Sequence, residues 1–302
     1  MLKDKKLVFV VGSARSGTTW LQSLLSQSPR AGTAPETYLF SNYLRSLPES
    51  WRRHEGTATG LSNLISEDEF VEWMRGFAAL CLGRLADCRP NAFILVEKTP
   101  KHGAYAADIL RLFPDAFFVH IIRDPRAVVP SLRAASGSWG SSWAPSRLAD
   151  ACRKWRRDVA NARVAGTQTK RYCEVRYEAL HADGPGEIMR LFASLGEPVS
   201  REEAESYVAA SAFDKVRPTV SAPEEVDAQF YRRGEVDSWR RELSGSDIAI
   251  IERLTRKQMA ELGYEPVAGR RDRMIAEARL QAYRAANKVA KAMRAGADRI
   301  KP

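Results

Sequence analysis

Cysteine is scarce in this sequence, and its spacing argues against two common classes of site. Only four cysteines occur among 302 residues, and no two of them form a C-x-x-C pair. Such pairs are typical of structural zinc sites, and closely spaced cysteines build disulfide frameworks. The sequence therefore indicates neither kind of site, and we expect a cytoplasmic protein with reduced thiols.

Long apolar runs are also missing. No stretch approaches the length of about 20 residues that a transmembrane helix needs. Three lysines precede the apolar residues 7–11, as they would in a signal peptide. That run is too short, however, and it does not lead into a small-residue cleavage site. We therefore expect neither a signal peptide nor a membrane-spanning helix.

A lysine is absent from the loop around which the chain is organised. Residues 7–11 are a short β-branched run typical of a buried strand, and the apolar residues after Gly17 follow helical spacing. Between them, residues 12–19 match a Walker A loop except that Thr18 replaces its lysine. Because that lysine contacts the terminal phosphates of a nucleoside triphosphate, its absence argues against ATP or GTP turnover. Arg15 restores a positive charge, so we predict a phosphate-binding loop.

Further strands are predicted at residues 93–97, 117–122 and 172–177, with helical patterns between them. Cationic side chains follow two of these strands, Lys98 after one and Arg123 after the next. Ligands of open α/β sheets bind beyond the carboxyl ends of the strands. The pattern therefore places both cations where an anion would bind, although Lys98 is also compatible with a solvated loop lysine.

Aromatic side chains are concentrated in two places. Those of residues 67–86, including Trp73 and Phe77, recur at helical spacing and predict a helix packed into the core. Trp139 and Trp143 lie in a stretch rich in glycine and serine. Such a composition suits a lid over an acceptor, or a loop that the two tryptophans anchor to the core.

The C-terminal segment is unusually basic. Residues 270–302 contain ten Lys or Arg against three Asp or Glu, which accounts for +7 of the net charge of +10. Small apolar residues recur there at three- and four-residue steps, as in a heptad seam: Ile275, Ala278, Ala282, Ala285, Val289, Ala292 and Gly296. We expect a main domain over residues 1–269, followed by a basic amphipathic helix. It would dock on its own body, on a partner subunit in a homodimer, or on an acidic membrane surface at the inner face of the membrane.

Several motifs, in order, resemble the sulfotransferases that use 3′-phosphoadenosine 5′-phosphosulfate (PAPS). The match is closest to the carbohydrate and protein-tyrosine branch and its bacterial relatives, and it extends over residues 5–266. The matching segments are residues 15–19, 97–100, 122–126 with Ser131, 176–180, 195–196 and 232–234, then Trp239 and residues 262–264. The resemblance implies an α/β fold with a P-loop-kinase-like central parallel sheet flanked by helices, followed by the C-terminal basic helix.

The resemblance also implies PAPS as sulfuryl donor, with separate sites for its 5′-phosphosulfate and its 3′-phosphate and with no metal. The implied cofactor-binding residues are Arg15, Ser16, Gly17, Thr18, Thr19, Trp20, Arg123, Ser131, Tyr177, Arg232, Arg233 and Gly234. Lys98 and Arg15 would stabilise the charge that develops on the leaving phosphate. The implied reaction is an in-line displacement by the hydroxyl of a sugar, a glycolipid or another small-molecule alcohol.

The general base differs between branches of this family. In the cytosolic branch a histidine two residues after the lysine serves, but Pro100 occupies that position here. In the carbohydrate and tyrosine branch a glutamate serves, and Glu36 stands at the matching place. Without the resemblance, Glu36 would be interpreted as an acid at a helix start. His102 is the alternative base.

Two other classes of function are compatible with the sequence. One is a P-loop nucleotide or small-molecule kinase, which would turn over ATP with magnesium. The other is a non-catalytic protein that binds nucleic acid or a membrane through its basic tail. We expect a small-molecule or glycan acceptor and no specific nucleic acid.

Overall fold

The structure is a computed structural model that describes the chain except residues 1, 3, 88, 212–234 and 299–302. The chain forms two compact units. Unit 1 comprises Met1–Arg123 and Arg157–Val236, and unit 2 comprises Asp124–Arg156 and Asp237–Pro302. The boundary that we predict at residue 269 remains a prediction.

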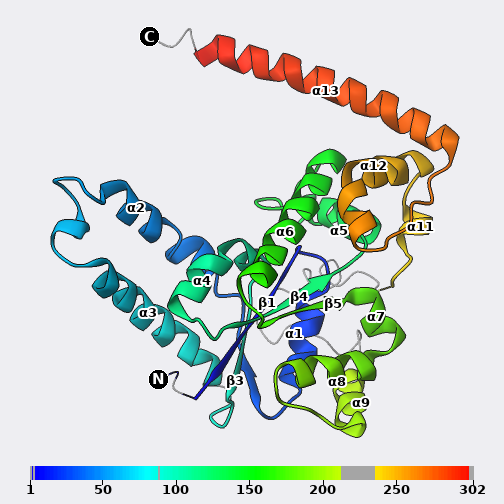
Figure 1. The fold of residues 1–302 in the computed structure, drawn as a ribbon. Coiled ribbons are helices and arrows are strands. Elements are labelled where there is room, and N and C mark those ends of the chain that lie inside the picture. Colours follow the sequence, from blue (N-terminus) through cyan, green and yellow to red (C-terminus); the bar gives the residue numbers. More distant parts are fainter. Residues whose placement is uncertain (1, 3, 88, 212–234, 299–302) are drawn as a thin grey trace. The chain divides into compact units, whose positions relative to one another are not determined.

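A five-stranded sheet forms the centre of unit 1, with strand order β2-β3-β1-β4-β5 and parallel pairing throughout (Figure 1). The strands are β1 (Lys6–Gly12), β2 (Ala31–Thr33), β3 (Ile94–Lys98), β4 (Phe117–Ile122) and β5 (Tyr172–Arg176). In the register of the sheet, Val10 lies between Lys98 on β3 and Val119 on β4. The predicted α/β fold with a parallel sheet is confirmed, and the ends of β1, β3 and β4 meet at one edge.

The short strand β2 is not among the strands that the sequence predicts. Its three residues are held by pairing with β3, in which Ala31 lies opposite Ile94. A Cβ atom at Gly32 would lie 2.4 Å from the carbonyl oxygen of Leu85, so the glycine permits this close approach. Pairing rather than an apolar pattern makes this segment a strand.

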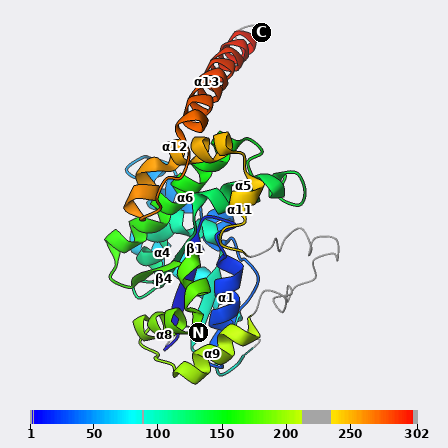
Figure 2. The same ribbon diagram turned by 90° about the vertical axis from the view of Figure 1, so that its right-hand side faces the viewer.

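Helices cover both faces of the sheet (Figures 1 and 2). Val8 and Val10 of β1 face a core formed with α1 (Thr18–Ser26), α7 (Tyr177–Ala182), α8 (Gly184–Ser194) and α9 (Arg201–Ala210). Leu7 and Phe9 face a second core formed with α2 (Ser46–His54), α3 (Glu67–Gly83) and α4 (Ala106–Leu112). The short helical turns are η1 (Leu39–Tyr43), η2 (Leu61–Asn63), η3 (Arg84–Ala86) and η4 (Pro100–Tyr105). Burial on both faces explains the uninterrupted apolar run of β1.

Unit 2 is helical. It contains α5 (Pro125–Ser136), the start of α6 (Leu148–Gln168), α11 (Trp239–Glu242), α12 (Gly245–Glu261) and α13 (Arg270–Asp298). Arg126 is buried in unit 2, and its guanidinium forms ion pairs with Asp124 at 2.7 Å and with Glu252 at 3.0 Å. The same guanidinium lies 4.3 Å from the ring centroid of Trp239. Arg126 therefore has a structural role within the motif at residues 122–126.

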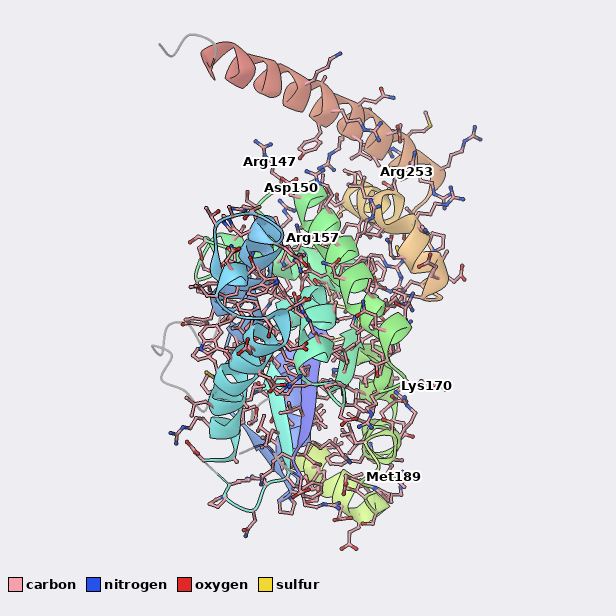
Figure 3. All side chains as sticks on the ribbon, turned by 60° about the vertical axis from the view of Figure 1, so that its left-hand side comes forward. Arg147, Asp150, Arg157, Lys170, Met189 and Arg253 are labelled. Carbon is pink, nitrogen blue, oxygen red and sulfur yellow. The ribbon has the colours of Figure 1, made fainter. Side chains whose placement is uncertain are left out.

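The predicted C-terminal helix is present as α13. The side of it that packs against the rest of unit 2 is not the predicted heptad seam. Ala276 and Leu280 are buried against α12, whereas Ile275 of the predicted seam is 41% exposed. Side chains labelled in Figure 3 add polar contacts: the Tyr283 hydroxyl donates to Asp150 at 3.2 Å, and Arg253 lies 3.7 Å from Glu277. The first turns of α13 therefore pack on unit 2, with the described part of the seam on another side. Among the described residues, no helix combines the length and apolar character needed to cross a bilayer.

Candidate functional site

The loop between β1 and α1 has the backbone of an anion-binding site. Gly12 adopts a φ of +146°, and a Cβ atom there would lie 2.5 Å from the carbonyl oxygen of Ile121. Arg15 also has a positive φ, 73°, which is uncommon for a residue with a side chain. Gly17 is the N-cap of α1, and no side chain caps this helix. The N–H groups of its first turn are therefore oriented for an external anion.

Ser16 supplies an independent sign that the loop binds a ligand. Its side chain is 1% exposed, and its hydroxyl has no hydrogen-bond partner among the described residues. Buried hydroxyl groups are nearly always hydrogen-bonded in native proteins. The neighbouring Ser13, by contrast, donates to Asp158 at 3.2 Å. An anion held in the loop would provide the missing partner for Ser16.

Three separate motifs converge beside this loop. The Arg123 guanidinium lies 3.9 Å from the centroid of the Tyr177 ring, and it donates to the carbonyl of Glu235 at 2.8 Å. The Tyr177 ring packs edge-on against Trp20, with centroids 5.3 Å apart. A Cβ atom at Gly17 would lie 2.6 Å from that ring, so only glycine fits. Burial raises the pKa of Tyr177, which keeps its phenol protonated.

The other predicted cofactor-binding residues lie in α1, in α5 or outside the described residues. Thr18 and Thr19 open α1, and Thr18 is buried there. Ser131 is a buried residue of α5 in unit 2. The predicted residues Arg232, Arg233 and Gly234 lie outside the described residues. The roles of these residues remain predictions.

Lys98 and Glu36, which are 62 positions apart in the sequence, form an ion pair. The Lys98 Nζ atom lies 2.5 Å from Glu36 Oε1, and the two side chains are 7% and 26% exposed. Lys98 is the last residue of β3, and Glu36 follows β2, the neighbouring strand. The parallel sheet therefore places a carboxylate and an ammonium together at its carboxyl edge.

Tyr38 contacts the same carboxylate. Burial and the nearby Glu36 carboxylate raise the pKa of its phenol, which stays protonated. Tyr38 also has a positive φ of 51°, a strained conformation that often occurs at functional sites. The Glu36 carboxylate is thus paired with the Lys98 ammonium and lies near a neutral phenol.

A buried hydrogen-bond network underlies this pair. Glu97, 1% exposed, accepts hydrogen bonds from the hydroxyls of Thr37 and Thr99 at 2.9 and 2.6 Å, and it contacts His102 Nδ1 at 2.8 Å. His102 Nε2 accepts from the Phe40 amide at 3.2 Å, so the ring proton resides on Nδ1. Burial alone would raise the pKa of Glu97, but His102 and the hydroxyls hold it below its usual range. The network ties the segment after Glu36 to the end of β3.

His102 and Glu36, the two candidate bases, differ in their access to solvent. His102 is fully buried, and both of its ring nitrogens are engaged within the protein. Glu36 is partly exposed beside Lys98. The Glu36 carboxylate is therefore accessible from solvent, whereas the ring nitrogens of His102 are not.

Glu97, Thr37 and Tyr38 lie at the candidate site, although motif positions in the sequence do not point to them. Only Glu97 carried a usable signal, because a charged residue at the end of an apolar strand must find partners when it is buried. The contacts of Thr37 depend on long-range pairing. The residue types around Tyr38 do not indicate its positive φ.

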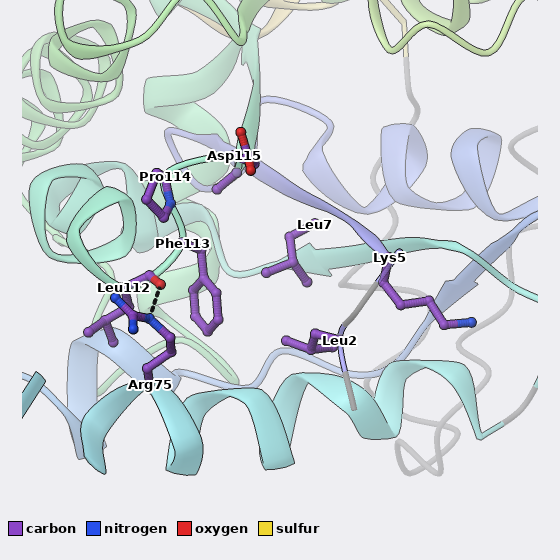
Figure 4. A pocket seen from close by; sticks show the side chains of 9 residues that line it. Leu2, Lys5, Leu7, Arg75, Leu112, Phe113, Pro114 and Asp115 are labelled. Carbon is purple, nitrogen blue, oxygen red and sulfur yellow. Dashed lines mark hydrogen bonds between the residues drawn. The ribbon is translucent and has the colours of Figure 1, made fainter. Parts of the chain in front are cut away.

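A cavity of about 270 Å³ lies at the other edge of the sheet (Figure 4). It is lined by Leu2, Lys5, Leu7, Arg75, Leu112, Phe113, Pro114, Asp115 and Ala116. The Arg75 Nε atom donates to the Leu112 carbonyl at 2.8 Å beside it. Because β1 and β4 begin at this edge, the cavity does not belong to the candidate site at their carboxyl ends.

Comparison with known proteins gives consistent matches. A model of the sulfotransferase family matches residues 8–201. A putative protein-tyrosine sulfotransferase of Caenorhabditis briggsae is 26% identical over 191 residues, covering 62% of this chain and 64% of the relative. Nodulation protein NoeE of Sinorhizobium fredii is 25% identical over 296 residues, covering 86% of this chain and 66% of the relative. The chain thus spans just under two thirds of the length of each.

A solved structure matches at the level of the fold. Mouse sulfotransferase SULT7A1 complexed with PAP superposes with a TM-score of 0.53 at 14% sequence identity. The match covers 84% of this chain and 85% of that one. Such a low identity shows shared architecture only.

Proposed function

The chain belongs to the sulfotransferase family, and we propose that it transfers a sulfuryl group from PAPS to an acceptor hydroxyl. The observation that carries this proposal is the Glu36–Lys98 pair. It lies at the carboxyl edge of the sheet, where the loop between β1 and α1 also begins. A phosphate site alone suits many enzymes. A carboxylate and an ammonium beside it suit proton removal at one oxygen and charge stabilisation at another.

The residues of unit 1 fit a donor with two anionic ends. The N–H groups of the first turn of α1 and the Ser16 hydroxyl would hold the 5′-phosphosulfate. Arg123, stacked on Tyr177, would hold the 3′-phosphate, as the motif resemblance implies. When bound, PAPS supplies an activated sulfuryl group on a phosphate leaving group.

In this proposal Glu36 is the general base and accepts the proton of the acceptor hydroxyl. Lys98, with Arg15, donates hydrogen bonds to the oxygen on which negative charge develops. The Glu36–Lys98 pair must separate for both groups to act, and Tyr38 remains to orient the carboxylate. We propose a sugar, glycolipid or other small-molecule alcohol as acceptor. The role of Trp139 and Trp143 as a lid remains a prediction; both lie in unit 2, with ring centroids 5.4 Å apart.

The 3′-phosphate assignment predicts selective binding of the nucleotide product. The unmodified protein should bind 3′-phosphoadenosine 5′-phosphate (PAP) more tightly than AMP. In Arg123→Ala that preference should fall by about 10–100-fold, because a charge-assisted hydrogen bond contributes about 1.5–3 kcal/mol. Isothermal titration calorimetry with PAP and AMP on both proteins measures this difference.

Arg171→Ala is the matched control, because Arg171 is an exposed arginine just before β5 that pairs with Asp115. Its preference for PAP should equal that of the unmodified protein. Equal affinities of the unmodified protein for PAP and AMP would overturn the 3′-phosphate assignment.

For α13 we propose contact with an acidic membrane surface. Met274 and Ile275 are 68% and 41% exposed, and the segment 270–302 is strongly basic. Exposed apolar side chains and cations on one helix are typical of interfacial binding. The protein should float with phosphatidylglycerol vesicles and not with phosphatidylcholine vesicles, with less binding at high salt. Absence of binding to phosphatidylglycerol at low salt would exclude this role.

A further inference from the structure

Helix α3 has two apolar faces, of which only one enters the core of unit 1. Phe70 and Met74 are buried, in keeping with the predicted core helix. Trp73, Phe77 and Leu80 from the same predicted stripe are 57%, 40% and 44% exposed, so that prediction is wrong for them. Large exposed apolar side chains grouped on one helix face mark an interaction surface.

A glycine lies in the middle of this exposed face. Gly76 is one turn from both Trp73 and Leu80, and a Cβ atom there would meet nothing within 4 Å. Glycine lowers helix stability relative to alanine, and packing within the chain does not require it here. Its effect is to leave a shallow space between larger side chains, into which a neighbouring side chain can fit.

The charges of α3 indicate what covers this face. Its first turns carry exposed acids, including Glu69 and Glu72, and Arg84 follows its last turn. The acids argue against an anionic membrane. Residues 69, 73, 76, 80 and 84 fall at four- and three-residue steps, so they share one exposed face. That face is acidic at one end, where Glu69 also caps the helix through Ser66, and it is apolar in the middle. It is basic at the other end, where Arg84 also lies 3.5 Å from the exposed Asp87.

Such a face is complementary to itself when two helices run antiparallel. A two-fold axis between Gly76 and Phe77 brings Phe77 over the glycine of the partner subunit. The same axis places Trp73 opposite the partner's Leu80, and Glu69 opposite the partner's Arg84. Every apolar and every charged position of the face then has a suitable neighbour.

We propose that the exposed face of α3 is the interface of a homodimer in which two copies of this chain pack α3 against α3 antiparallel. The exposed face is residues Glu69, Trp73, Gly76, Phe77, Leu80 and Arg84. The exposed Leu61 and Leu64 precede α3 and add apolar surface near its first turn. This interface is independent of the proposed sulfuryl transfer and lies on a different helix from α13.

Sedimentation velocity of the full chain over a dilution series tests the proposal. The unmodified protein should sediment as a dimer. Gly76→Glu should weaken association by about 10²–10³-fold, because it places a charge in each copy against the partner's Phe77. The same change should leave the melting temperature of the monomer unchanged or raised, because its Cβ meets open space and glutamate favours the helix more than glycine does.

A charge reversal supplies a second, specific readout. Arg84→Glu should weaken the dimer. Adding Glu69→Arg in the same chain should restore it, even though this change also removes the capping box of Glu69 with Ser66 and lowers the melting temperature of the monomer. Met274→Arg on α13 is the matched control and should remain dimeric, because Met274 is also exposed but lies on another helix. A monomer at all concentrations, or dissociation by Met274→Arg but not by Gly76→Glu, would overturn the proposal.

Discussion

Replacing Glu36 with glutamine is expected to lower sulfuryl turnover by about 10²–10⁴-fold, the usual contribution of a positioned acid–base group. Glutamine keeps the shape of the side chain and an oxygen that accepts from Lys98, so the local structure should persist. It removes the basicity, so the acceptor hydroxyl retains its proton. Turnover is measured by transfer of labelled sulfuryl from PAPS. The affinity for PAP should change little, because Glu36 is assigned to the acceptor.

The matched control is Glu49→Gln, which neutralises an exposed carboxylate on α2. It should leave turnover unchanged. The alternative base is tested with His102→Gln, whose folding is checked by its melting temperature because His102 is buried in the Glu97 network. Normal turnover in Glu36→Gln, with loss of turnover in a folded His102→Gln protein, would show that the base has been assigned to the wrong residue.

Replacing Lys98 with methionine should lower the maximal rate by about 10²–10³-fold, as removal of a donor to a developing oxyanion does in other enzymes. Methionine has nearly the same length and suits the buried stem of Lys98, but it carries no charge. The loss should appear mainly in kcat, because the charge that Lys98 stabilises develops during the reaction. Single-turnover measurements at saturating PAPS separate this effect from binding.

Lys101→Met is the control for this substitution, since Lys101 is exposed three residues further along the chain. It should keep the rate of the unmodified protein. Glu36 and Lys98 are in direct contact. The increase in activation free energy of the double variant Glu36→Gln/Lys98→Met should therefore be smaller than the sum of the increases of the two single variants. A rate for Lys98→Met within about threefold of the unmodified protein, well inside the effect expected for such a donor, would exclude the assigned role.

Much of the fold is predictable because the strands carry a strong local signal. The sequence predicts strands at residues 7–11, 93–97, 117–122 and 172–177, and β1, β3, β4 and β5 lie there. These apolar runs are buried on both faces of a parallel sheet, so their pattern is continuous. Strand β2 has no such run, and its identity depends on pairing with β3.

The sequence predicts individual residues of the candidate site, but it does not predict which of them contact one another. Glu36, Lys98 and Arg123 were identified from motif positions, whereas the ion pair between Glu36 and Lys98 depends on the adjacency of β2 and β3. Helical spacing likewise groups Trp73 with Phe70, but spacing alone does not say which of them faces the sheet. Long-range pairing decides both outcomes, and it is not encoded in any single stretch of residues.

The most direct test of the account is transfer of labelled sulfuryl from PAPS to a pool of glycans and small-molecule alcohols by the unmodified protein, with EDTA present. ATP labelled at its γ-phosphate, with magnesium, is the parallel donor. We expect labelled sulfated product from PAPS, dependent on Glu36, and no phosphoryl transfer from ATP. Phosphoryl transfer from ATP, without sulfuryl transfer from PAPS, would contradict it.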